Sequence, residues 1–121
     1  QLTQFYTENI ALGRAVSNEL LEQAKNDANR ARLEQTDTLF KHVDVLLTLS
    51  APGEAPKGTL LTGDPLFNKV WTMLGLPCVT IPFQKGPSGL PLALQIVAPM
   101  NKDSLALVAS AWFEKVLSQG Y

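Results

Sequence analysis

The sequence contains one cysteine and one histidine in 121 residues. A single cysteine cannot form an internal disulfide, so nothing in the sequence points to an oxidising compartment, and we expect a cytoplasmic location. One cysteine and one histidine are also too few for a protein-borne zinc site. The acidic residues are scattered along the chain, and no pair is spaced for holding a metal ion or for acid–base work. We therefore expect no metal and no other cofactor.

The sequence also lacks an excess of charge of one sign, and it lacks long apolar runs. The chain is 45% hydrophobic and 17% charged with a net charge of −1, so nothing attracts nucleic acid or an anionic membrane surface. No apolar run approaches the ~18–20 residues of a membrane-spanning helix, and no basic stretch precedes an apolar one near the N-terminus. We therefore predict one globular domain, or part of one, without a nucleic-acid or membrane partner.

The first third of the chain has the pattern of a long helix. Residues 1–16 are expected to be irregular or partly ordered, and Ser17 or Asn18 can then cap the helix. Apolar residues recur at spacings of three, four and eight, and charged residues of both signs occupy the other faces. This pattern predicts a surface helix with one buried stripe, formed by Leu21, Ala24, Ala28, Ala31, Leu39 and Val43.

Three short apolar segments are typical of buried strands: residues 44–49, 78–82 and 92–97. The second and third are separated by residues 85–89, a Gly- and Pro-containing turn that is too short for a crossover, so these two strands should pair antiparallel. The first and second strands are joined through a helix and should run parallel, with a right-handed connection.

The connection between the first two strands contains a loop and a short helix. Residues 50–63 are rich in Pro, Gly and Thr and are expected to form the loop. Asp64 can cap the helix, Pro65 suits its first turn, and Gly75 followed by Pro77 can end it.

A second amphipathic helix is expected from about Asp103 to Ser118. Its apolar face is broad, and three short strands offer too little surface to cover it, so we expect part of the fold to be missing and the isolated chain to self-associate. The predicted fold class is α/β: part of a mixed β-sheet of about three strands, flanked by a long N-terminal helix, a short crossover helix and a C-terminal helix. The face of the last helix is formed by Leu105, Val108, Ala109, Trp112 and Val116, with Leu107, Ala111 and Leu117 beside it.

A nucleophile beside a base is hard to find in this sequence. Cys78 begins an apolar strand, where a cysteine is expected to be a buried small hydrophobe with a raised thiol pKa. His42 lies near the end of the long helix, where the helix dipole favours it, and a Cys78–His42 dyad is the disfavoured alternative. Residues 86–89 lack the spacing of a phosphate-binding loop and precede a strand, so we predict a hairpin turn. The residues alone therefore reveal no active site.

Four motifs occur in order between residues 44 and 103. They are Asp44–Thr48 with Ala51–Pro52, Trp71–Pro77 running into Cys78–Pro82, Gly89–Val97, and Asp103 at the start of the last helix. Together with the preceding long helix they resemble the C-terminal part of amidase signature enzymes, over about residues 13–117. Thr72 stands where many members have Asn, and Ala93 and Ala98 stand where many have Gly. These departures put substrate detail in doubt rather than the family.

The resemblance implies that the parent protein is an amidase that hydrolyses the C–N bond of a small-molecule carboxylic amide. Family members use a Ser nucleophile, a second Ser in a cis peptide and a neutral Lys, and backbone N–H groups of a Gly/Ser-rich stretch stabilise the oxyanion. These residues lie in the N-terminal and central parts of the family. The 8 glycines here are dispersed, and no Ser pair has a Gly-Ser-Gly context. We therefore expect residues 1–121 to be a C-terminal fragment of the amidase signature domain, without catalytic residues and inactive alone.

By family position, the loop before Pro65 and the region of Thr72 approach the substrate. Asp64 and Thr72 are thus the candidate substrate-binding residues. The simpler interpretation of Asp64 is a helix cap, which contributes about 1 kcal/mol of stability. For Thr72 and Gln95 the simpler interpretation is a buried, hydrogen-bonded structural role. The alternative function is a stand-alone, non-catalytic binding or scaffold module that keeps the amidase C-terminal fold.

Overall fold

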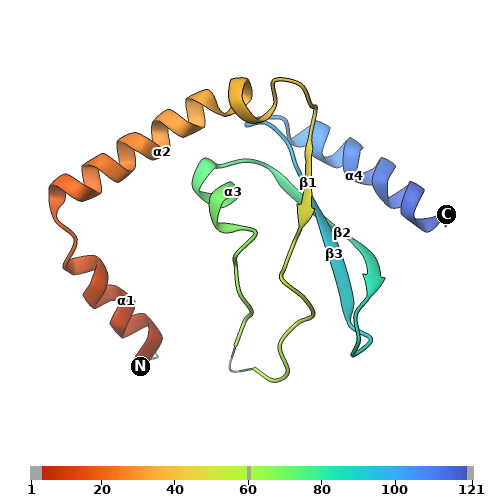
Figure 1. Ribbon diagram of the computed structural model, residues 1–121, viewed down its shortest axis with the longest axis horizontal. Coiled ribbons are helices and arrows are strands. Elements are labelled where there is room, and N and C mark those ends of the chain that lie inside the picture. The colour runs from red at the N-terminus through yellow and green to blue at the C-terminus, as the bar shows by residue number, and fades with distance from the viewer. Residues whose placement is uncertain (1–3, 60, 120–121) are drawn as a thin grey trace.

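The computed structural model describes residues 4–59 and 61–119. They form an α/β fold, as predicted, with the three expected strands (Figure 1). In chain order the elements are α1 (Gln4–Arg14), α2 (Asn18–Leu39), β1 (Leu46–Leu49), α3 (Lys69–Leu74), β2 (Cys78–Lys85), β3 (Pro91–Val97) and α4 (Asp103–Ser118).

The three strands form one sheet in the order β1-β3-β2. The antiparallel pairing of β2 with β3 is confirmed, and Thr80 lies opposite Gln95. β1 also pairs antiparallel with β3, and Thr48 lies opposite Gln95 there. β1 and β2 therefore share one direction, as predicted for strands joined through a helix, but they are not neighbours, because β3 lies between them. Every pairing between the described strands is antiparallel.

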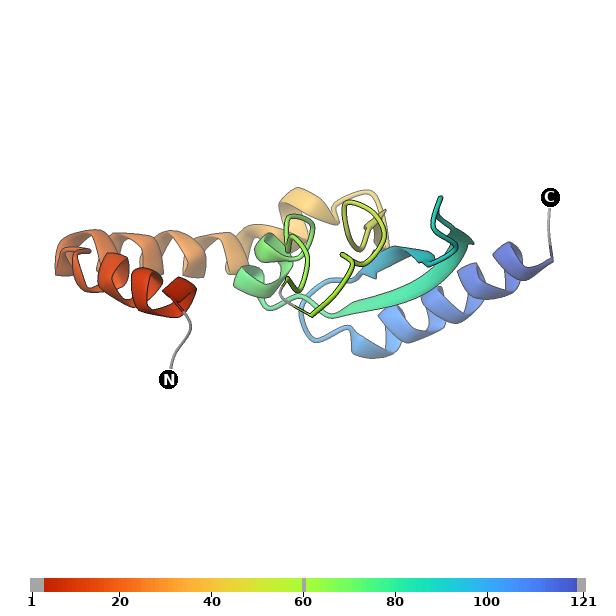
Figure 2. The ribbon, with the colours of Figure 1, turned by 90° about the horizontal axis from the view of Figure 1, so that it is seen from below.

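The sheet is covered differently on its two faces. α4 lies against β2 and β3 on one face, while α3 and the loop after β1 lie on the other (Figure 2). On the α3 face, β3 adds its last residue to the core, which consists of Phe40, Leu74, Leu76 and Val97. On the α4 face, Ile81 and Ile96 are buried beneath the helix. The core therefore continues through the sheet.

The expectation of irregular structure over residues 1–16 is wrong for residues 4–14, which form α1. The run before Gly13 contains neither Pro nor Gly, and Gln4 Nε2 donates a hydrogen bond of 2.8 Å to Glu8 Oε1 one turn later. Such pairs stabilise a helix locally. The glycine that argued against a helix lies only one residue before its end.

α2 begins as predicted, because Ser17 caps it and Leu20 N–H donates to Ser17 Oγ at 3.2 Å. The predicted buried stripe is wrong over most of its length, although Ala31 packs against the core as predicted. Leu21 and Val43 at its two ends are 44% and 47% exposed. Most of α2 projects away from the sheet, and its C-terminal half meets α3 (Figure 1). There, Arg32 donates two hydrogen bonds, of 2.9 and 2.6 Å, to the carbonyl of Met73.

α3 begins later than predicted. Its N-cap position is Asn68 rather than Asp64, so the interpretation of Asp64 as a helix cap is wrong. The carbonyl of Pro65 accepts hydrogen bonds from the N–H groups of Asn68 and Lys69, at 2.9 and 3.1 Å, and a turn therefore precedes the helix. The predicted end is confirmed, because Gly75 has a left-handed φ of 70°.

Replacing Gly75 with alanine is expected to destabilise the chain by about 1 kcal/mol, because a Cβ is disfavoured at a left-handed φ. The shift in the urea midpoint of unfolding measures this. Gly13→Ala is the matched control, since Gly13 lies in α1 with nothing within 4 Å of an added Cβ. That change should be neutral or slightly stabilising. Equal destabilisation by both changes would contradict the prediction.

α4 has the predicted bounds, but its buried line differs from the prediction. Val108 and Trp112 are 69% and 59% exposed, whereas Ala106 and Ser110 are buried. Small side chains let a helix approach a sheet closely, and this decides which side of a broadly apolar helix turns inward. The outer side of α4 stays apolar and exposed.

Candidate functional site

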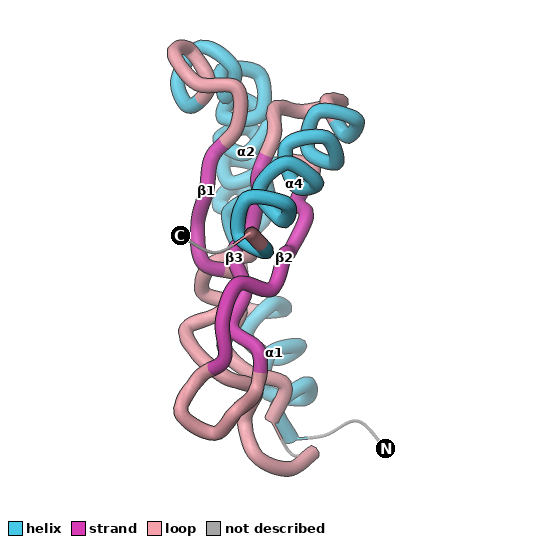
Figure 3. Tube along the Cα trace, turned by 90° about the vertical axis from the view of Figure 1, so that its right-hand side faces the viewer, coloured by secondary structure: helices cyan, strands magenta, loops and turns pink. Residues whose placement is uncertain are grey.

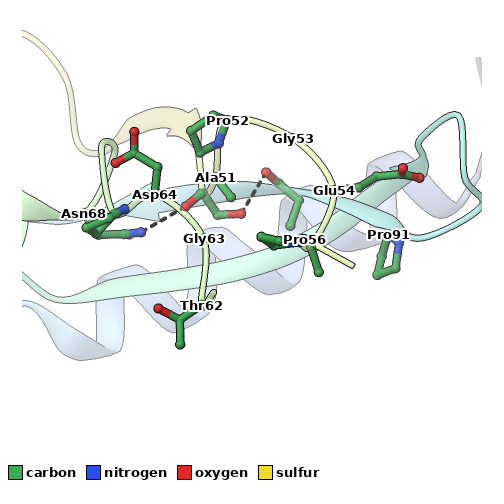
Figure 4. A pocket seen from close by; sticks show the side chains of 14 residues that line it. Ala51, Pro52, Gly53, Glu54, Pro56, Thr62, Gly63, Asp64, Asn68 and Pro91 are labelled. Carbon is green, nitrogen blue, oxygen red and sulfur yellow. Dashed lines mark hydrogen bonds between the residues drawn. The ribbon is translucent and has the colours of Figure 1, made fainter. Parts of the chain in front are cut away.

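A pocket of about 510 Å³ lies between the loop after β1 and the first half of β3 (Figure 4). Its wall combines Pro and Gly backbone with a few polar side chains. The lining residues that carry the argument are Ser50, Glu54, Asp64, Asn68, Pro91 and Ala93.

Hydrogen bonds hold the start of this loop against the sheet and against the turn before α3. The backbone N–H and the hydroxyl of Ser50 both donate to the carbonyl of Ala93, at 3.1 Å each. The side-chain amide of Asn68 donates to the carbonyl of Ser50 at 3.0 Å (Figure 4). Three segments that are distant in the sequence therefore meet at one end of the pocket.

Glu54 anchors the loop at a second point. Its two carboxylate oxygens accept hydrogen bonds from Ser88 N–H, at 2.9 and 3.0 Å, and one also accepts from Leu90 N–H at 3.0 Å. The residues that donate belong to the turn between β2 and β3, which is the predicted hairpin turn. Gly86 makes room for this contact, because a Cβ there would lie 2.5 Å from Glu54 Cγ. The backbone of the turn thus binds an anion, and that anion is a side chain of the same protein.

The two candidate substrate-binding residues occupy different places. Asp64 is exposed and lines the pocket, near Asn68. Thr72 is exposed on α3, outside the residues that line the pocket, so the buried structural role favoured for it is wrong. Gln95 is 2% exposed, and its Nε2 donates to the carbonyl of Phe67 at 3.5 Å, which confirms its structural role.

Sequence reasoning missed Ser50, Glu54 and Asn68. Glu54 is a charged residue between Gly and Pro residues in a predicted loop. That position was the only feature of the sequence that hinted at a structural partner for its carboxylate. Nothing local to Ser50 or Asn68 indicated their partners, because both contacts span 18 residues or more.

Cys78 and His42 do not form a nucleophile–base pair. Cys78 is exposed at the start of β2, contrary to the buried position predicted, and its Sγ donates to the carbonyl of Leu76 at 3.5 Å. Partial burial of the sulfur raises the pKa of this thiol, which disfavours the nucleophilic thiolate. His42 is exposed after α2, and no hydrogen bond joins it to Cys78 in the part of the chain that the structure describes.

Two further site types find no support within residues 4–59 and 61–119. Those residues contain no group of three or more His, Cys, Asp or Glu side chains that could hold a metal ion. None of their helices is long and apolar enough to cross a membrane.

Comparison with known proteins identifies relatives in one family, although no family model matches the chain. A glutamyl-tRNA(Gln) amidotransferase subunit from Synechococcus sp. (strain WH7803) is 33% identical over 86 residues, which is 65% of this chain and 18% of that protein. The corresponding mitochondrial protein from Bos taurus is 34% identical over 82 residues, or 60% of this chain and 16% of that protein. The chain thus spans less than a fifth of the length of these relatives.

A solved structure matches over a larger part of the chain. The crystal structure of an amidase superposes with a TM-score of 0.80 at 27% sequence identity, and the match covers 94% of this chain and 29% of the amidase. The ordered motifs, the sequence relatives and the shared fold agree with one another. In both sequence and fold, the chain is similar to amidase signature enzymes.

Proposed function

We propose that the chain is the C-terminal part of an amidase that hydrolyses carboxylic amide C–N bonds, with the catalytic residues outside it. The observation that carries the proposal is the superposition on an amidase, which includes nearly the whole chain but less than a third of that enzyme. The sequence relatives are named as subunits of an amidotransferase, and this name also refers to amides. The single cysteine further supports a cytoplasmic location.

The proposed reaction uses a Ser nucleophile, a second Ser in a cis peptide and a neutral Lys from the rest of the enzyme. The Lys takes the proton of the nucleophile through the second Ser, and the nucleophile attacks the amide carbonyl. The C–N bond breaks as the leaving amine gains a proton, and water then hydrolyses the acyl-enzyme. The Gly/Ser-rich stretch that would stabilise the oxyanion is lacking in this sequence.

Within that enzyme, the loop after β1 would contribute a wall of the substrate pocket. Asp64 presents an exposed carboxylate there, and a carboxylate can accept a hydrogen bond from the N–H of an amide. Thr72 is the second proposed contact, because its hydroxyl is exposed on α3 and available to a substrate held by the assembled enzyme. The small-molecule amide would be the partner of the whole enzyme.

The purified 121-residue chain should release no ammonia from simple amides above the buffer rate, whereas the full-length parent should hydrolyse them. Turnover by the chain that persists after Cys78→Ala would contradict this result. The reading frame upstream of Gln1 provides an independent check. A Lys codon and a Gly/Ser-rich stretch there support the enzyme, and a start codon directly before Gln1 supports a stand-alone binding or scaffold module.

A further inference from the structure

The loop after β1, residues 50–64, lies beyond the same end of the sheet as the turn between β2 and β3 (Figure 3). Its described residues form no helix or strand. At its start, Ser50 is bonded to Ala93 and to Asn68. Among the described residues of the loop beyond Ser50, only Glu54 makes hydrogen bonds to another segment. The position of most of the loop therefore depends on one carboxylate.

The turn that receives this carboxylate is held in shape by its own backbone. Gly86 N–H donates to the carbonyl of Leu90 at 2.8 Å, and Gly89 N–H donates to the carbonyl of Gly86 at 3.0 Å. Neither bond involves the loop after β1. The N–H groups of Ser88 and Leu90 that point at Glu54 are thus arranged in advance, and the turn is a fixed point to which the loop is attached.

A short and stiff path leads from Glu54 to Asp64 on the other arm of the loop. Pro56 has a fixed φ and restricts the residue before it to extended backbone, so the segment that follows Glu54 bends little. The ring of Pro56 lies against Gly63, where its Cδ is 3.7 Å from the position that a Cβ would take (Figure 4). Asp64 follows directly, and Pro65 restricts its backbone in the same way.

We propose that Glu54 is a positioning residue for substrate binding, which holds the loop so that the Asp64 carboxylate is in place before a substrate arrives. This inference rests on the proposed amidase function, with Asp64 as a substrate contact. The apparent affinity of a ligand falls with the fraction of molecules in the binding-competent state. Loss of Glu54 should therefore weaken substrate binding. The catalytic step should change little, because its residues lie outside this chain.

The 121-residue chain tests the positioning without a substrate. In Glu54→Ala, NMR order parameters of the Gly63 and Asp64 amides should fall toward the value of about 0.6 that marks flexible backbone. These amides make no hydrogen bond to Glu54, so they respond only if Glu54 fixes the second arm of the loop. Unchanged order parameters there, while only the amides of the turn respond, would overturn the proposal. Glu54→Gln keeps a neutral acceptor and should show a smaller change, which keeps the test informative if the alanine variant does not fold.

Steady-state kinetics of the full-length parent provides the second arm. Glu54→Ala should raise KM for simple amides about tenfold and leave kcat within about twofold, as expected when binding alone is weakened. Gly86→Ala should do the same, although Gly86 does not line the pocket, because its new Cβ would displace the carboxylate. Glu54→Gln should raise KM by only about threefold. Ile96→Val is the control, since it removes a buried methylene on the other face of the sheet and should leave KM and kcat unchanged.

The kinetic outcomes separate this inference from the proposed function. Glu54→Ala with an unchanged KM would overturn the inference, and so would an equal rise in KM for Ile96→Val, which would show that KM follows stability alone. An unmodified parent that hydrolyses no simple amide would instead contradict the proposed function. In that case the order parameters of the 121-residue chain still decide whether Glu54 fixes the position of Asp64.

Discussion

Replacing Ile96 with alanine is expected to lower the free energy of unfolding by about 3–4 kcal/mol, near the upper part of the range for buried aliphatic residues. Ile96 is 0% exposed in the central strand of the sheet, beneath α4. Its loss removes apolar contacts and leaves a cavity, and the hydrogen-bonded ladders on both sides of β3 restrict collapse around it. A loss of this size can exceed half of the stability of a small domain.

Urea unfolding at one fixed protein concentration measures this effect. Leu33→Ala is the control, because Leu33 is 83% exposed on α2 and its truncation should change the stability by no more than about 0.5 kcal/mol. Ile96→Val should cost about 1 kcal/mol and keeps the test informative if the alanine variant is unfolded. Equal midpoints for Ile96→Ala and Leu33→Ala would show that α4 does not cover this face of the sheet.

The features that sequence reasoning predicted well are those that local chemistry determines. A serine before a helical run caps α2, and a glycine with a left-handed φ ends α3, because each needs only its nearest neighbours. The turn at residues 85–89 was predicted for the same reason, and with it the antiparallel pairing of β2 and β3.

The features that were predicted wrongly depend on distant parts of the chain. An apolar stripe shows that a helix face can be buried, but it does not show that another element covers that face. Because α2 extends beyond the sheet, most of its stripe stays exposed. On α4, apolar residues occur on several sides, so the choice of Ala106 for the sheet face depended on close approach to β2 and β3. The same limit applies to the pocket. Asp64 was identified from the sequence, whereas Glu54 was missed because its hydrogen-bond partners are 34 and 36 residues away.

Removing the Glu54 carboxylate, as in Glu54→Ala, is expected to cost about 2 kcal/mol. Hydrogen bonds to a charged acceptor are worth about 1.5–3 kcal/mol each when shielded, and solvent reduces that value for a half-buried group. The loop after β1 should then separate from the β2–β3 turn. The amides of Ser88 and Leu90, which donate to this carboxylate, should exchange faster with solvent.

Gly86→Ala should reproduce the effect of Glu54→Ala, because the new Cβ would lie 2.5 Å from both Cγ and Oε1 of Glu54 and displace the carboxylate from the turn. The two changes act on one contact, so the double variant should lose far less stability than the sum of the two single losses. Gly53→Ala is the control, since an added Cβ there meets nothing within 4 Å in the same loop. Additive losses in the double-mutant cycle would show that Gly86 is needed for the backbone of the turn rather than for the carboxylate. Non-additive losses would establish Glu54 as the residue that fixes this wall of the pocket.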